Sequence, residues 1–320
     1  MSARLSQYAR ENLHAILLAC LTVLYLVLSV IPFLANGPHP LGYDTGFYRR
    51  YLINPVEALP NTPVPGLDHT IIAPRIFLDA VRFLGLSPDV SLYGSYILLS
   101  LFFIVIFYFF VKEYTDKKTA LAAVVLLVLS PTQYTAYWFM LYKNLFGLIF
   151  FFLTLIFLKK KWFWPALASA LIIPLSHQTT TIIFLGILSG YIFLTLILKR
   201  KFLVPELTIL ALTLFTYLYL HPHVQQKIDA PPVGVFIEKL EFLLLAAPLF
   251  LFALFGIQKF ATLLKQNLLA ASFGIVVVAF PLFSLPYYQR VFLFDNYWLT
   301  IGAAIGVVVL IDYISNKRHL

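Results

Sequence analysis

The sequence predicts an all-α polytopic membrane protein with about ten transmembrane helices and both termini in the cytoplasm. First, 61% of its 320 residues are hydrophobic and only 12% are charged, whereas soluble domains are about 45–50% apolar and about 25% charged. Second, hydropathy divides the chain into ten apolar segments. Third, the basic residues concentrate in alternate loops between these segments. A soluble chain of this composition could not cover its surface with polar side chains.

The apolar segments define the expected elements, since a spanning helix needs about 20 apolar residues. The candidate spans are residues 13–35, 91–111, 119–133, 139–158, 162–175, 180–198, 202–220, 242–257, 267–285 and 294–314. Residues 1–12 and 315–320 are then cytoplasmic tails. Residues 13–314 form the transmembrane domain, with a long external loop at 36–90. The single Cys20 lies in the first apolar segment, which excludes a disulfide framework.

The distribution of charge predicts the orientation. One set of alternate loops, with the two tails, holds 15 of the 23 basic residues and three acids. The positive-inside rule places this set in the cytoplasm. The net charge of +9 is then explained by the orientation of the chain in the membrane and by the attraction of its basic loops to anionic lipid. A nucleic-acid partner is not needed to explain it. We expect a multi-pass protein of the plasma (cytoplasmic) membrane whose active face is external.

The first external loop contains two stretches with helical spacing. "DTGFYRRYL" predicts a short helix with Asp44 near its start, where a carboxylate is favoured. "IIAPRIFLDAVRFLG" places Arg75, Asp79 and Arg82 on one face and apolar residues on another. Both stretches are expected to be interfacial helices, and the second should lie flat on the membrane instead of crossing it.

Two of the candidate spans are short. The apolar helices that end near Pro131 and Pro174 last about 13 residues, or ~20 Å, and a hydrocarbon core is ~30 Å thick. Polar, non-helical backbone at membrane depth is tolerated only inside protein or beside water. These stops therefore predict a cavity that opens outward, or alternatively two helices that continue through their prolines with a kink. The expected lining residues are Gln133, Tyr134, Lys143, Asn144, His177 and Gln178.

The candidate functional residues each have two interpretations. Asp44 is either a general base or a helix N-cap. Asp68 and His69 either orient an acceptor or hold a divalent ion, or they are solvated loop residues. His177, followed by a polar run, is either a catalytic residue or a hydrogen-bonded structural one.

The cationic and aromatic candidates complete this set. Arg290 and Lys143 either bind a lipid phosphate or extend to the interface without a partner. Tyr288 belongs to an aromatic belt or stacks on a sugar ring. Walker, GxGxxG and HExxH motifs are absent from the sequence, so no nucleotide or metal cofactor is expected.

With these parts in order, the chain resembles the GT-C superfamily of membrane glycosyltransferases. The resemblance covers roughly residues 10–200. It rests on "GYDTGFYRRYL" after the first span, then the long external loop, then "LSPTQYTAYWFMLYKNLFGLIFFFLTLIFLKKK" and "LIIPLSHQTTTIIFLG". The remainder of the chain matches only as generic helices.

The resemblance implies an inverting transfer of a sugar from a polyprenyl-phosphate donor to a glycan, lipid or protein acceptor. The family's catalytic acid corresponds to Asp44, and its lipid-phosphate contacts to Arg290 and Lys143. Asp68, His69, Asn144, Gln178 and Tyr288 are further candidates for the substrate site. "GYDTG" has one acid and no D-x-D pattern, so no metal is assigned. Acceptor recognition is expected to be minimal or supplied by an accessory subunit.

Three alternatives stay open at this stage. One is a polysaccharide polymerase or O-antigen-ligase-like enzyme, although the second external loop, residues 221–241, holds few cations. Another is a transporter or lipid flippase without catalysis, for which broken helices and repeats would be typical. The third is a membrane scaffold with no activity.

Overall fold

The described part of the chain is entirely helical. The computed structural model describes residues 12–36, 45–54, 72–220, 237–285 and 288–317. Within these ranges there is no strand, which confirms the all-α prediction. The helices are α2 (Leu13–Asn36), α3 (Thr45–Ile53), α5 (Ile72–Arg82), α6 (Pro88–Tyr114), α7 (Lys117–Val128), α8 (Pro131–Trp138), α9 (Tyr142–Lys159), α10 (Phe163–Ile172), α11 (Gln178–Lys199), α12 (Val204–Leu220), α14 (Lys239–Phe255), α15 (Ile257–Gln266), α16 (Leu268–Leu282) and α17 (Tyr288–Lys317).

The helices make this a multi-pass membrane protein, but the predicted count of ten spans is not confirmed. Each of the ten apolar segments contains a helix. Among the described residues, five are long and apolar enough to cross a membrane: α2, α6, α9, α11 and α17. The number rises to seven if α7 with α8 and α14 with α15 each form one bent span. The others are short, and α10, with ten residues, extends only about 15 Å.

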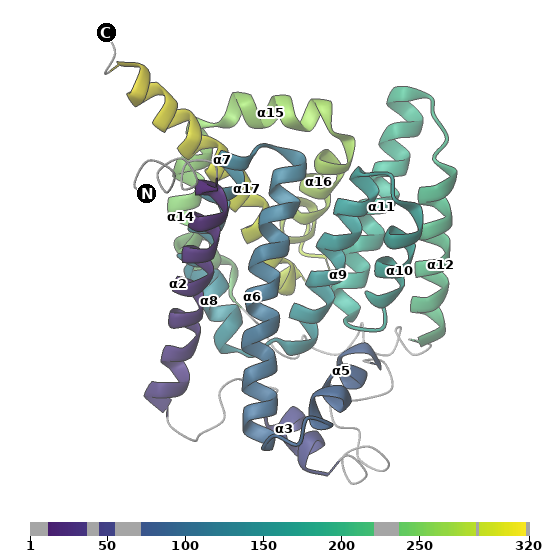
Figure 1. Cartoon of the computed structure of the whole chain (residues 1–320). Helices are drawn as coiled ribbons and strands as arrows, with labels where there is room; N and C mark the ends of the chain where they lie inside the picture. The colour runs from purple at the N-terminus through teal and green to yellow at the C-terminus, as the bar shows by residue number, and fades with distance from the viewer. Residues whose placement is uncertain (1–11, 37–44, 55–71, 221–236, 286–287, 318–320) are drawn as a thin grey trace.

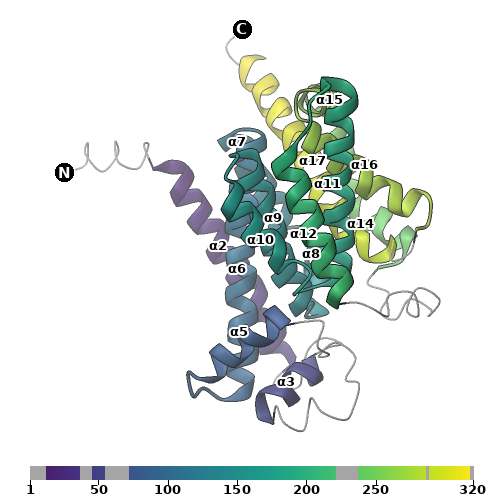
Figure 2. The same cartoon turned by 90° about the vertical axis from the view of Figure 1, so that its right-hand side faces the viewer.

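Most helices pack side by side in a bundle with distinct ends (Figure 1). At one end lie α3 and α5, which we call the α3/α5 end. At the other, α15 lies across the bundle, and α2 begins and α17 ends there; we call it the α15 end. The second view preserves this arrangement (Figure 2). Which end faces the cytoplasm remains a prediction from the distribution of charge.

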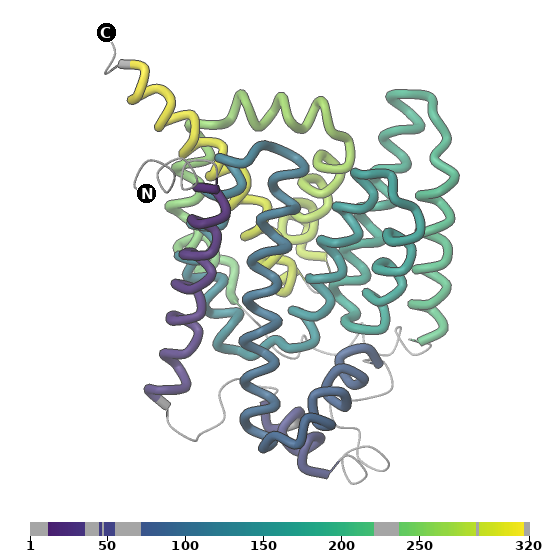
Figure 3. The backbone as a smooth tube through the Cα atoms, in the orientation of Figure 1, coloured from purple at the N-terminus to yellow at the C-terminus, as the bar shows by residue number. Residues whose placement is uncertain are grey.

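Local sequence explains where several helices begin. Ser87 caps α6 by accepting a hydrogen bond from Val90 N, and Pro88 occupies its first turn. Asp116 caps α7 through the backbone N–H groups of Lys118 and Thr119. The chain turns sharply from α14 into α15, by 81°, as the tube in Figure 3 shows.

The two predicted proline stops both end a helix. α7 ends before Pro131, and α10 ends two residues before Pro174. The expectation of non-helical backbone after the first stop is wrong, however. Ser130 caps a new helix, and α8 continues at an angle of 55° to α7. A proline fits the first turn of a helix, where its missing N–H would have no intrahelical partner.

Candidate functional site

Helix α3 is anchored to the bundle by buried side chains. Thr45 Oγ1 donates to Met140 Sδ at 3.1 Å, at the junction between α8 and α9. The ring of Tyr48 packs against that of Tyr142 with centroids 5.2 Å apart. The Tyr142 hydroxyl in turn hydrogen-bonds Ser95 Oγ of α6 at 3.0 Å. The stretch that follows Asp44 is therefore held firmly against the first turn of α9.

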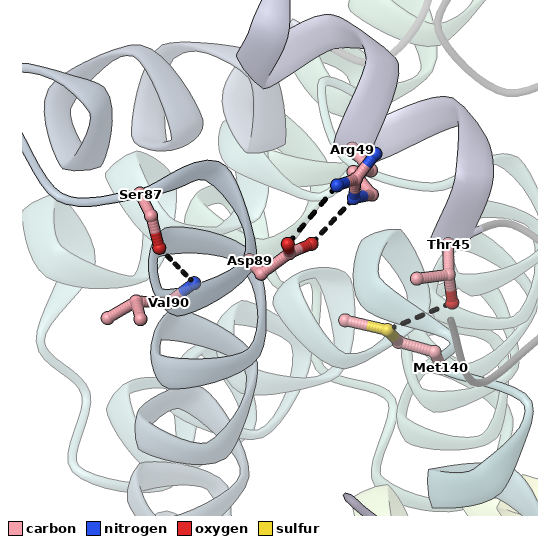
Figure 4. A network of polar contacts seen from close by, with 6 residues as sticks. All are labelled: Thr45, Arg49, Ser87, Asp89, Val90 and Met140. Atoms are coloured by element: carbon pink, nitrogen blue, oxygen red, sulfur yellow. Dashed lines mark hydrogen bonds and ion pairs between the residues drawn. The ribbon is translucent and has the colours of Figure 1, made fainter. Parts of the chain in front are cut away.

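An ion pair joins α3 to the first turn of α6. The Arg49 guanidinium donates to both carboxylate oxygens of Asp89, at 2.6 and 3.2 Å (Figure 4). The hydrogen bond and negative charge of Asp89 raise the pKa of Arg49. Both side chains are about 40% exposed, so solvent screens the pair, and we assign it about 1 kcal/mol at most. Arg49 thus acts as an anchor for α3.

Helix α5 connects α3 to the turn that precedes α11. Tyr51 of α3 donates a hydrogen bond of 2.6 Å to Asp79 of α5. The backbone N–H of Ala73 donates to Leu175 O at 3.0 Å. These contacts place α3, α5, the start of α9 and the turn at residues 173–177 together at the α3/α5 end.

His177 is the N-cap of α11 and is 3% exposed. Its Nδ1 accepts from Thr180 N at 3.3 Å and lies 2.9 Å from Thr180 Oγ1. A Cβ on Gly147 of α9 would lie 3.3 Å from the His177 Cβ. The base of the His177 side chain is therefore packed against α9, and its Nδ1 positions the start of α11.

The other predicted lining residues are divided between different surroundings. Lys143 is half-buried, four residues before Gly147 and so one turn away on a similar face of α9. Asn144 and Gln133 line a narrow pocket with about 260 Å³ of empty space, including its opening, together with four tyrosines. Gln178 Nε2 instead donates to the Tyr217 hydroxyl of α12 at 3.3 Å. The pocket lined by Asn144 does not include His177, Gln178 or Lys143.

Two candidates belong to the start of α17. Tyr288 meets Phe292 edge-on with ring centroids 6.0 Å apart, and Phe292 stacks on Phe242 of α14 at 4.6 Å. Arg290 is half-buried beside them in the sequence. The observed contacts of Tyr288 are thus those of a packed aromatic residue.

Asp44, Asp68 and His69 lie outside the described residues, so their predicted roles stay predictions. The nearest described neighbour is Thr45, which directly follows Asp44 and is fully buried.

The structure also reveals a buried polar group that the sequence analysis missed. Asn296, which is not exposed at all, accepts a hydrogen bond of 3.0 Å from Ser130 Oγ at the break between α7 and α8. Beside it in α17, Asp295 is 9% exposed, and its Oδ2 has no hydrogen-bond partner among the described residues. Ionisable residues inside a membrane are costly and usually functional. In the sequence this buried polar group is visible as two adjacent polar residues, Asp295 and Asn296 of "FDNYW", within an apolar segment.

Metal ligands do not cluster within the described ranges: no group of three or more His, Cys, Asp or Glu side chains could hold an ion there. In comparisons with known proteins, no protein-family model and no curated protein matches the chain.

Proposed function

We propose that this protein is a membrane glycosyltransferase that resembles the GT-C superfamily and uses a polyprenyl-phosphate sugar donor. The observation that carries the proposal is the anchoring of α3. Thr45, the residue after Asp44, contacts Met140 directly before α9, the helix that presents Lys143 in its first turn. We propose that Asp44, which precedes Thr45 in the sequence, meets Lys143 at this end of the bundle. We propose that this end is the external face of the plasma membrane.

The proposed reaction is a single displacement with inversion. Asp44 takes the proton from the acceptor hydroxyl as its oxygen bonds to the anomeric carbon. The bond from that carbon to the phosphate oxygen breaks, and the electron pair leaves with the polyprenyl phosphate. Lys143 and Arg290 stabilise the charge that develops on the phosphate.

The remaining residues are given supporting roles. His177 positions the first turn of α11, since its Nδ1 is engaged in the helix cap. Asp68, His69 and Tyr288 contact the acceptor or the sugar, and Asn144 and Gln178 support the helices that surround the site. The acceptor is a glycan, lipid or protein, and no resident cofactor takes part.

The test replaces Asp44 by Asn in the full chain, reconstituted in nanodiscs with a panel of radiolabelled short-chain polyprenyl-phosphate monosaccharides. We expect the release of polyprenyl phosphate to fall by roughly 10²- to 10⁴-fold, the usual contribution of a general base. The matched control is Asp116→Asn, because it makes the same charge change at the α15 end and asparagine is also a good N-cap. Full activity in folded Asp44→Asn protein would rule out the catalytic role.

A transporter is the second candidate, and Asp295 favours it. A carboxylate buried inside a span and two helix pairs bent at their breaks are features of ion-coupled transporters. In liposomes without a lipid-linked donor, this alternative predicts proton flux that Asp295→Asn abolishes and Asp44→Asn does not. The glycosyltransferase proposal predicts no such flux in either protein.

A further inference from the structure

A wide pocket opens at the α15 end, far from the site described above. It encloses about 1260 Å³ of empty space, including its open mouth. Three turns of the chain meet there: α9 to α10, α11 to α12, and α15 to α16. The turn between α11 and α12 rises above that between α9 and α10, as Figures 1 and 2 both show, and α15 lies near the same level. The pocket occupies this step in the end of the bundle.

The charged lining is strongly basic. Lys159, Lys161, Lys199 and Lys201 line the pocket and are exposed, and Glu206 is the one acid among the lining residues. The ion pairs found in the described part of the chain do not involve these lysines. The neighbouring Lys160, which does not line the pocket, is the residue that pairs with Glu113, at 3.0 Å.

Between the lysines the pocket is apolar, with one buried donor. Phe163, Leu203, Ile209 and Leu268 contribute to its lining. Asn267 also lines it; its Oδ1 caps α16 by accepting from Ala270 N at 3.3 Å. Its Nδ2 is buried and has no hydrogen-bond partner among the described residues. Such a donor favours an oxygen-bearing ligand, because an unsatisfied buried group destabilises the folded protein.

We propose that this pocket binds the headgroup of an anionic phospholipid that carries two phosphates. The phosphates contact the lysines, and the acyl chains extend along the apolar lining. Basic pockets between transmembrane helices on the cytoplasmic side suit such headgroups, and the charge distribution predicts that the α15 end is cytoplasmic. A membrane lipid fits better than a soluble phosphate because the lysines surround an apolar surface. Trp162, which lines the pocket and is half exposed, is also typical of the headgroup level.

The backbone offers a matched pair of variants. Lys161 and Arg200 both have left-handed conformations, with φ of 59° and 49°. Glycine adopts this conformation without strain, so Lys161→Gly and Arg200→Gly each remove one positive charge without harming the fold. Lys161 lines the pocket and Arg200 does not. Their comparison therefore separates the pocket from the general charge of the surface.

The experiment is native mass spectrometry of the purified full chain, titrated with cardiolipin in the presence of excess phosphatidylcholine. We expect one tightly bound cardiolipin per chain and about fivefold weaker binding in Lys161→Gly, but unchanged binding in Arg200→Gly. Replacing Lys161, Lys199 and Lys201 together by glutamine should weaken binding roughly 100-fold. The control triple, with the same change of charge, replaces Lys112, Lys117 and Lys118, which lie outside the pocket.

Three results would overturn the proposal. The first is the absence of retained cardiolipin in the unaltered protein. The second is equal weakening in the pocket variants and their controls, which would show non-specific attraction to the charged surface. The third is inorganic pyrophosphate displacing cardiolipin at equal concentration, which would assign the lysines to a soluble phosphate ligand.

Discussion

Replacement of His177 tests whether this side chain acts as a helix cap or in the chemistry. Alanine removes the acceptor for Thr180 N and the partner of Thr180 Oγ1, at a site that is 3% exposed. Loss of an N-cap costs about 1 kcal/mol, and a buried hydroxyl that loses its partner adds about 1 kcal/mol or more. We therefore expect His177→Ala to lower the free energy of unfolding by about 2 kcal/mol. Asparagine is a good N-cap, so His177→Asn should lower it by less than about 1 kcal/mol.

The assay is unfolding in mixed micelles of increasing SDS content, followed by tryptophan fluorescence. Gln178→Ala serves as the matched control, because it lies in the same turn and loses only the 3.3 Å hydrogen bond to Tyr217. If His177→Ala is no less stable than this control, the capping geometry is wrong. If His177→Asn is stable but has lost sugar transfer, the imidazole takes part in the reaction and the positioning role is refuted.

Two further predictions concern packing and pH. An alanine Cβ at Gly306 would overlap the carbonyl oxygen of Phe252 and lie 2.8 Å from its carbon, so Gly306→Ala should lower the free energy of unfolding by about 3 kcal/mol in the SDS assay. At Gly302 a Cβ meets nothing closer than 3.6 Å, so Gly302→Ala should change the free energy of unfolding by less than about 1 kcal/mol. Burial, and then the Asp79 carboxylate, raises the pKa of Tyr51 to about 12. The stabilisation from this raised pKa is therefore complete below pH ~10, the unfolded value, and is lost as the pH rises toward 12.

The outcomes that contradict these two predictions are distinct. Equal destabilisation by alanine at Gly306 and Gly302 would mean that α17 does not approach α14 as closely as described. For Tyr51, the tyrosinate absorbance of the unaltered protein minus that of Tyr51→Phe isolates one phenol. A titration of this difference centred near pH 10 would show that Tyr51 is not buried against Asp79.

Part of the fold was predictable because it depends on local sequence. Each apolar segment contains a helix, and several helices begin at residues whose side chains cap them, such as Ser87 and Asp116. The two proline stops were also visible, since proline cannot continue an α-helix without losing a hydrogen bond. The count of ten spans is not confirmed, because only five to seven spans among the described residues are long and apolar enough, and apolar composition alone does not distinguish a spanning helix from a shorter one packed within the bundle.

For the candidate site, the sequence predicted individual residues but not which of them contact one another. The composition of the first loop suggested a helix around Arg49, but its partner Asp89 lies 40 residues further along the chain. Asp44, the leading candidate, lies outside the described residues, so its role depends on the resemblance and on the anchored Thr45. The contact that brings α3 close to the start of α9, where Lys143 lies, joins Thr45 to Met140, 95 residues away, and the sequence alone did not predict it.

By itself, the sequence determined that the chain is a helical membrane protein, because hydropathy and helix capping act between near neighbours. Only the tertiary structure decided which polar groups meet inside it. The pair of Ser130 and Asn296 joins residues 166 positions apart and holds the break between α7 and α8 against α17. A buried polar group needs a partner, and when local backbone cannot supply one, the packing of distant helices selects it.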